Sequence, residues 1–224
     1  MKRFDPAEVA HYDHRIRRLV PGYDLLHLLS SAELLARLPE DAARVLVVGA
    51  GTGTELLALA GQRPGWCFTA TDLSAPMLAV AQQRCLAAGI QERVQLHVGE
   101  LDRLQGPAPH DAALLLLVAH FVPDDGRKQA LLAQTAAQLR PGAPLLLADL
   151  RAGADALERR CHGEASRLLG LGEDEVAAML QRLESSFHPV DAARREALLR
   201  ATGFGPARLY FRAAGFEAVV SLRL

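Results

Sequence analysis

The sequence contains few of the residues that build disulfide-linked or membrane-spanning proteins. Its three cysteines, Cys67, Cys85 and Cys161, are widely spaced and form no C-x-x-C pair, so they support neither a disulfide framework nor a zinc site. The longest apolar run, at 112–119, is far shorter than the roughly 20 residues that span a bilayer. We therefore expect a buried strand there and no membrane partner.

Lysine is also scarce, because Lys2 and Lys128 are the only lysines among 25 basic residues. The formal net charge of -1 gives no general attraction to nucleic acid, which we do not expect as a partner. The first 18 residues are charged throughout and lack the apolar stretch of a secretory signal, so a cytoplasmic location is expected. The 224 residues, 50% of them hydrophobic, suit one globular domain.

Helix and strand patterns alternate along most of the chain, which predicts an α/β domain with a mostly parallel sheet. No helix separates the last two strand patterns, so they predict an antiparallel hairpin. Residues 1–40 are expected to form an N-terminal helical lid, and 153–188 a helical insertion, within a single domain over 1–224. The predicted strands are 44–48, 67–72, 93–99, 111–118, 207–213 and 216–222, with a fifth in chain order that follows a proline-glycine turn within 140–150.

The most informative stretch is VLVVGAGTGTE at 45–55, where a strand pattern runs into three alternate glycines. A strand, a glycine turn and a helix N-terminus form a corner that binds anions or adenosine. The spacing is G-x-G-x-G rather than the G-x-G-x-x-G of dinucleotide sites, which disfavours NAD. Thr52 and Glu55 have the spacing of a capping box, which predicts that the next helix begins near residue 53.

Two acids follow the next strands at the same edge of the sheet. Asp72 ends the second strand, where a carboxylate can accept hydrogen bonds from both hydroxyls of a ribose. The alternative is an acid that caps its own turn, but Ser74 is already available as the helix cap, which favours the ribose. Glu100 follows the third strand and could hold an adenine amino group, although a solvated loop acid explains it almost as well.

Five stretches together resemble, in order and spacing, the motifs of class I S-adenosylmethionine-dependent methyltransferases: VLVVGAGTG, TATDLSAPML, VQLHVGELDRL, DAALLLLVAHFV and LRPGAPLLLADL. The resemblance covers about 40–222. It implies a Rossmann-like sheet of seven strands with helices on both faces and an antiparallel last strand. It also implies S-adenosylmethionine as the cofactor and a small molecule as the substrate.

The resemblance further implies a set of cofactor-binding residues. Those around the methionine part are Gly49, Ala50, Gly51, Thr52 and Gly53. Asp72 would bind the ribose, Leu116 would lie near the sulfonium, and the residues around the adenine would be Leu73, Met77, Glu100 and Leu101. One position departs from the family, because Val47 stands where an acid usually helps to hold the cofactor's amino group. Glu55 and backbone carbonyls are the candidate replacements.

A narrower likeness, in RRLVPGYDLL, HFVPDDGR and LYFRAAGF, is to the carboxy-S-adenosylmethionine synthases that serve wobble-uridine modification in tRNA. It implies that Tyr23 folds over the cofactor. Such a synthase needs a cation for the extra carboxylate on its product, and in EVAAMLQRLESSF only Arg182 offers one. Ordinary methyl transfer to a small molecule is therefore favoured, with a synthase or another tRNA-modifying enzyme as the alternative.

Methyl transfer from a sulfonium chiefly requires that the acceptor be aligned and water excluded. A general base is needed only when the acceptor must lose a proton. His120, just after the fourth strand, is the candidate base, but packing of this histidine against Phe121 explains it equally well. The candidates for the substrate pocket are Tyr12, Arg15, His27, Asp149 and Arg151.

For Tyr12 a place on the apolar face of its own helix is the stronger interpretation. His11 and His14 have no third ligand at a suitable spacing, so no metal is expected.

Three other hypotheses stay open on the sequence: a dinucleotide-dependent oxidoreductase, an enzyme of tRNA modification, and a cofactor-binding subunit without catalysis. The acceptor cannot be derived, because the fold and the cofactor corner specify only the methyl donor. The sequence does not fix the oligomeric state either, and a homodimer is one option.

Overall fold

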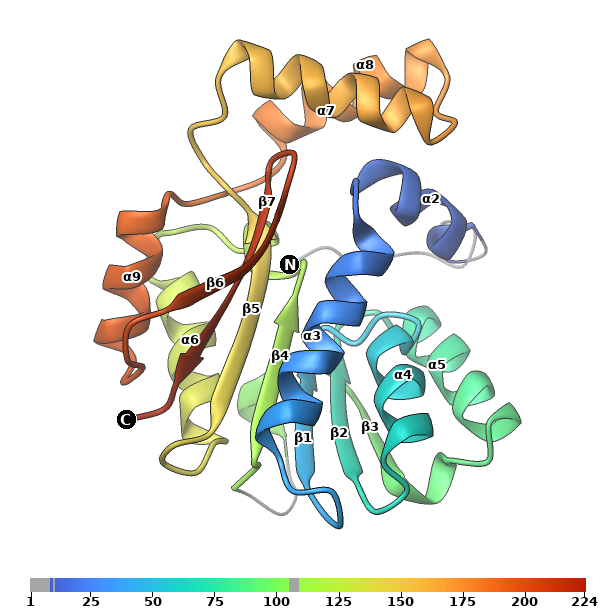
Figure 1. The fold of residues 1–224 in the computed structure, drawn as a ribbon, viewed down its shortest axis with the longest axis vertical. Helices are drawn as coiled ribbons and strands as arrows, with labels where there is room; N and C mark the ends of the chain where they lie inside the picture. The colour runs from blue at the N-terminus through green and yellow to red at the C-terminus, as the bar shows by residue number, and fades with distance from the viewer. Residues whose placement is uncertain (1–8, 10, 105–108) are drawn as a thin grey trace.

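A seven-stranded sheet in the order β3-β2-β1-β4-β5-β7-β6 runs through the middle of the molecule (Figure 1). In the computed structural model, which describes residues 9, 11–104 and 109–224, β1 to β5 are parallel, and β7 is antiparallel to both β5 and β6. The predicted Rossmann-like sheet is therefore confirmed. The strands are β1 Arg44–Val48, β2 Cys67–Asp72, β3 Val94–Val98, β4 Ala112–Leu116, β5 Pro144–Leu150, β6 Arg208–Ala213 and β7 Phe216–Leu222.

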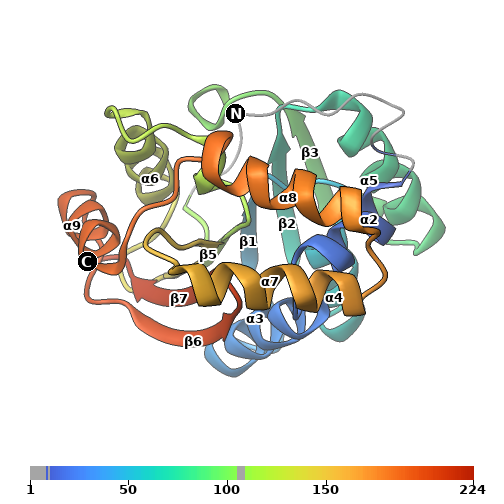
Figure 2. The ribbon, with the colours of Figure 1, turned by 90° about the horizontal axis from the view of Figure 1, so that it is seen from above.

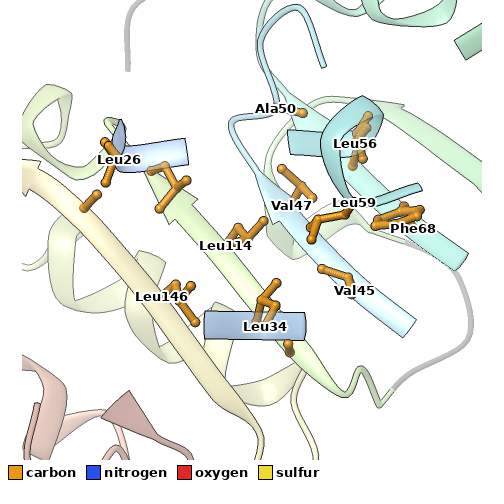
Figure 3. Close-up of a cluster of buried hydrophobic side chains, with 14 of the residues drawn as sticks. Leu26, Leu34, Val45, Val47, Ala50, Leu56, Leu59, Phe68, Leu114 and Leu146 are labelled. Carbon is orange, nitrogen blue, oxygen red and sulfur yellow. The ribbon is translucent and has the colours of Figure 1, made fainter. Parts of the chain in front are cut away.

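Helices cover both faces of this sheet. Because side chains alternate along a strand, Val45 and Val47 of β1 pack into one core, whereas Leu46 and Val48 pack into the other. The first core, shown in Figure 3, is covered by α3 Tyr23–Arg37, α4 Thr54–Gln62 and α5 Ala75–Ala87. The second is covered by α6 Arg127–Ala137 and α9 Ala192–Ala201. Each buried leucine stabilises this arrangement by about 1.5–3 kcal/mol.

Three further helices lie across the carboxyl end of the sheet, as Figure 2 shows from above. They are α2 Tyr12–Leu19, α7 Ala156–Leu168 and α8 Glu173–Ser185, and we call them the lid helices. His162 Nε2 lies 3.0 Å from the carbonyl oxygen of Leu19, and Arg18 donates to the carbonyl of Gly170 at 3.1 Å. These two contacts join α2 to α7 and the turn that follows it. Among the described residues, no helix is long and apolar enough to cross a membrane.

The single-turn helices are η1 Gln91–Arg93, η2 Leu101–Arg103 and η3 Ala119–Phe121. The last of these falls near the end of the strand predicted at 111–118, which in the structure stops at Leu116. Leu117 then adopts a left-handed conformation with φ of 59°, and its amide donates to the carbonyl of Ala148 at 2.7 Å. Such a conformation costs roughly 1–2 kcal/mol for a residue other than glycine. The apolar run gave no local signal for this turn.

The predicted capping box at Thr52 and Glu55 was wrong. Gly53, with φ of 85°, is the residue that precedes α4, and no side chain caps this helix. The Thr52 hydroxyl donates instead to the Asp13 carboxylate of α2 at 2.7 Å. The Thr52 hydroxyl therefore bonds to a residue of α2 instead of capping α4, and Glu55 does not complete a capping box.

Candidate active site

A cavity of about 400 Å³ lies beneath the lid helices, where β4 and β5 end. We call it the lid cavity. Its walls are mainly apolar and include Phe121, Phe187, Phe216, Met179 and several leucines. The polar side chains on its wall include Tyr12, Arg15, His120 and Arg182. Its size and mixed lining are those of a site for a small organic molecule.

A second, smaller cavity adjoins the glycine turn, and we call it the turn cavity. The structure brings together here eight of the predicted residues: Tyr12, Tyr23, His27, Gly49, Ala50, Gly51, Thr52 and Leu116. Glu55 also lines it, and so does Leu117. Because Tyr12 and Leu117 line the lid cavity as well, the two cavities share a wall. A ligand in one therefore lies next to a ligand in the other.

The three glycines of the turn meet different constraints. A Cβ added at Gly49 would lie 2.3 Å from Cγ2 of Val118, and one added at Gly53 would lie 3.1 Å from Cβ of Ala81. A Cβ at Gly51 would meet no atom within 4 Å. All three have positive φ, which glycine adopts at little cost. Packing thus explains Gly49 and Gly53, whereas Gly51 faces open space into which a ligand can fit.

This difference predicts that alanine at Gly49 chiefly lowers stability, whereas alanine at Gly51 chiefly weakens ligand binding. Gly49→Ala is expected to lower the free energy of unfolding by about 2–4 kcal/mol, since it combines overpacking with an unfavourable φ. Gly51→Ala is expected to cost about 1–2 kcal/mol from its φ alone, while its methyl group fills the ligand space. Calorimetric titration with S-adenosylhomocysteine and urea unfolding would separate the two effects. If folded Gly51→Ala bound S-adenosylhomocysteine normally, Gly51 would not face the ligand.

Asp72 lies next to the turn and binds its backbone. Its Oδ2 accepts the Gly51 amide at 2.9 Å and its Oδ1 accepts the Ser74 amide at 2.8 Å. Burial raises the pKa of this carboxyl group, while both amides favour its charged form. The two carboxylate oxygens offer about four lone pairs. The amides of Ser74, Gly51 and Leu73 use three of them, so the turn-capping role leaves one for a ribose hydroxyl, and the ribose role stays a prediction.

The residues predicted around the adenine lie after β2 and β3. These two strand ends are joined, because the Gly99 amide donates to the Asp72 carbonyl at 2.9 Å. Glu100 is exposed, Leu73 is half-buried, and Met77 and Leu101 are buried. Their contact with an adenine stays a prediction.

His120 lies on the wall of the lid cavity and is held by Asp149. The Oδ1 atom of Asp149 accepts the backbone amide of His120 at 3.0 Å and also bonds to its ring Nδ1. The ring packs against Phe121 and, edge-on, against Phe187, with centroids 4.3 and 4.9 Å away. When the protonated Nδ1 donates a hydrogen bond to the carboxylate, the neutral ring carries its free lone pair on Nε2.

The backbone around His120 is also fixed, by a buried lysine. Lys128 Nζ donates to the carbonyl oxygens of Ala119 at 2.5 Å and His188 at 2.9 Å. The His188 amide in turn donates to the His120 carbonyl at 2.7 Å. Burial lowers the pKa of Lys128, opposed by the charges of Asp149 and Asp124. The lysine therefore ties η3 to the segment that follows α8.

The remaining predicted pocket residues do not all reach the lid cavity. Tyr12 and Arg15 line it, His27 lines the turn cavity, and Asp149 lies behind His120. Arg151 is not among the residues of either cavity, because it donates to Glu158 at 2.7 Å and lies 3.4 Å from Glu217. Sequence reasoning missed Leu117 and the aromatic wall, since apolar residues distant in sequence give no local sign of converging.

Comparison with known proteins identifies similar folds and sequences. Residues 46–145 match a family described as "Methyltransferase domain". The carboxy-S-adenosyl-L-methionine synthase of Chromohalobacter salexigens is 28% identical over 98% of this chain and 83% of that protein.

Two solved structures share the fold at lower identity. An O-methyltransferase family 2 protein from Planctomyces limnophilus, in complex with apigenin, has a TM-score of 0.62 at 18% identity over 91% of this chain. A putative O-methyltransferase from Nostoc punctiforme has a TM-score of 0.69 at 15% identity over 97% of this chain. The chain spans 61% and 60% of the length of these two structures.

Proposed function

Because the chain carries a class I S-adenosylmethionine-dependent methyltransferase domain, we propose that it methylates a hydroxyl group of a small molecule held in the lid cavity. The bound cofactor supplies a methyl group that its sulfonium already activates. The turn cavity suits the amino-acid end of this cofactor, since it offers open space at Gly51 and buried unpaired nitrogens on His27. The pairing of His120 with Asp149 on the wall of the lid cavity is the observation that carries the proposal.

In this proposal His120 is the general base. Its Nε2 accepts the proton that the acceptor hydroxyl loses as its oxygen takes the methyl group. Asp149 holds the ring in the required tautomer and stabilises the imidazolium that forms, as the acid does in Ser-His-Asp triads. The lid helices keep water from the transferring methyl group. An acceptor with no proton to lose would make this arrangement unnecessary.

The walls of the lid cavity also narrow the class of acceptor. Three phenylalanines and Met179 suit an apolar or aromatic body. Arg15 and Arg182 line the cavity, and in the described part of the chain neither side chain has an ion-pair partner. We therefore propose an aromatic hydroxyl compound with an acidic substituent. The apigenin bound by the Planctomyces limnophilus protein supports a small-molecule acceptor in general.

A panel of hydroxybenzoates and matching neutral phenols tests this function, with S-adenosylhomocysteine and the methylated product measured by mass spectrometry. We expect turnover of hydroxybenzoates at a lower KM than of the neutral phenols. Arg182→Gln is expected to raise the KM of hydroxybenzoates about 5- to 10-fold, which corresponds to about 1–1.4 kcal/mol, and to leave that of neutral phenols unchanged. Arg160→Gln, on the neighbouring helix, is the control. Equal effects on both acceptor classes would contradict an acid-binding role.

The second candidate is a carboxy-S-adenosylmethionine synthase. The similarity to the Chromohalobacter salexigens protein along nearly the whole chain favours it, and Arg15 or Arg182 could hold the extra carboxylate of the product. Incubation with S-adenosylmethionine and prephenate separates the two candidates. Carboxylated cofactor in the mass spectrum would support the synthase, whereas S-adenosylhomocysteine formed only with a phenolic acceptor would support O-methylation.

A further inference from the structure

Glu55 and His27 form a buried polar pair on the wall of the turn cavity. Glu55 belongs to the first turn of α4 and His27 to α3, and each residue is 8% exposed. Their closest nitrogen and oxygen, His27 Nδ1 and Glu55 Oε1, are 3.7 Å apart, which is too long for a hydrogen bond. Both ring nitrogens of His27 are buried without a hydrogen-bond partner. A buried polar atom without a hydrogen bond lowers the stability of the protein unless a ligand or water supplies that bond.

The charge states of this pair do not compensate each other. Burial lowers the pKa of His27 to about 4, so the ring is neutral at neutral pH. Burial raises the pKa of Glu55 to about 7, opposed by a hydrogen bond from its own backbone amide and assisted by the charge of Asp72. Ionised Glu55 is therefore a buried negative charge that His27 does not neutralise. Among the described residues that line the turn cavity, Glu55 is the only carboxylate.

We propose that Glu55, assisted by the neutral ring of His27, binds the ammonium group of the cofactor's amino-acid end. A cation there pairs with the carboxylate and donates a hydrogen bond to one ring nitrogen, which the protein alone leaves unpaired. The glycine turn on the same wall provides backbone groups but no acid, and position 47 of the preceding strand is a valine. The tilted contact of the His27 ring with Tyr23, at 4.3 Å between centroids, fixes the ring in the cavity.

Binding of the cofactor by Glu55 does not depend on the identity of the acceptor or on the role of His120. Its test therefore uses binding without turnover. The two probes are S-adenosylhomocysteine and its deamino analogue, which keeps the carboxylate but lacks the ammonium group. In calorimetric titrations at pH 8, Glu55→Gln is expected to weaken S-adenosylhomocysteine binding about 10- to 100-fold, corresponding to a buried charge-assisted interaction.

The same variant is expected to bind the deamino analogue as the unmodified protein does, within twofold. His27→Phe, which keeps the ring contact with Tyr23, is expected to weaken S-adenosylhomocysteine binding about threefold to tenfold. Glu92→Gln replaces an exposed acid of η1 and should change neither affinity. If Glu55→Gln weakened both probes equally, or neither, the ammonium assignment would be overturned.

Discussion

His120→Ala is expected to lower kcat for a hydroxybenzoate acceptor about 10²- to 10⁴-fold, the usual contribution of a general base. The reason is geometric, because Asp149 bonds to Nδ1 and the other ring nitrogen carries the lone pair on the wall of the lid cavity. S-adenosylhomocysteine binding, measured by calorimetry, should stay within about twofold of that of the unmodified protein. This split between chemistry and cofactor binding distinguishes a catalytic residue from one that only supports the fold.

A comparison of two phenol acceptors that differ in acidity provides a sharper control for the role of His120. A nitrophenol ionises without help, so its methylation by the His120→Ala variant should lose far less than that of an ordinary phenol. For the ordinary phenol, the rate of the variant should rise about tenfold per pH unit below the phenol's own pKa of about 10. Equal losses with both phenols would show that His120 acts on positioning rather than on the proton. Asp149→Asn is expected to give an intermediate loss, since the ring remains but its tautomer is no longer fixed.

The second large effect concerns stability. Glu55→Gln is expected to raise the Tm of the ligand-free protein by about 7–14 °C at pH 8, and by about 2–4 °C at pH 5. The pKa of Glu55 in the folded protein is raised by burial to about 7, against about 4.3 in an unfolded chain. The folded state therefore binds this proton more tightly. The free energy of unfolding of the protein falls by about 4 kcal/mol as pH rises through this interval.

His27 has the opposite effect on how stability depends on pH. Burial lowers its pKa to about 4, against about 6.5 when unfolded, so its contribution to stability is present above pH 6.5 and is lost as pH falls toward 4. The other titratable groups that face Glu55 are Asp72 of β2, Tyr12 of α2 and Tyr23 of α3. Burial raises the pKa of both tyrosines, which keeps them neutral here. The repulsion between Asp72 and ionised Glu55 is lost in Glu55→Gln, which adds to the expected gain in stability.

The slopes of Glu55 and His27 consequently oppose each other in the unmodified protein. Unfolding in urea between pH 4.5 and 8 should show a nearly flat contribution from this pair. In Glu55→Gln the free energy of unfolding should rise with pH, because only His27 contributes. In His27→Phe it should fall with pH, because only Glu55 contributes. A lower Tm of Glu55→Gln at pH 8 would mean that the carboxylate is already satisfied within the protein. The expected gain in stability with loss of cofactor binding is typical of a site prepared for its ligand.

Much of the fold could be predicted because the signals are local. The alternation of apolar and polar residues, the glycine turn and the hairpin after α9 each depend on neighbours in the chain, and all are present in the structure. The predictions were weakest where distant segments compete for one group. Thr52 matched a capping box, but Asp13 of α2 takes its hydroxyl. The run of leucines in β4 gave no sign that Leu117 turns out of the strand.

The candidate site shows the same division. The sequence by itself determined the sheet and predicted where the cofactor corner lies, because both follow from periodicity and from motifs whose residues are close together in the chain. Only the tertiary structure decided that His120 meets Asp149, that Arg151 pairs with Glu158 and Glu217, and that Glu55 is buried beside an unpaired His27. The physical reason is that burial and charge compensation depend on which strands and helices pack together, and this packing is not encoded in any one stretch of chain.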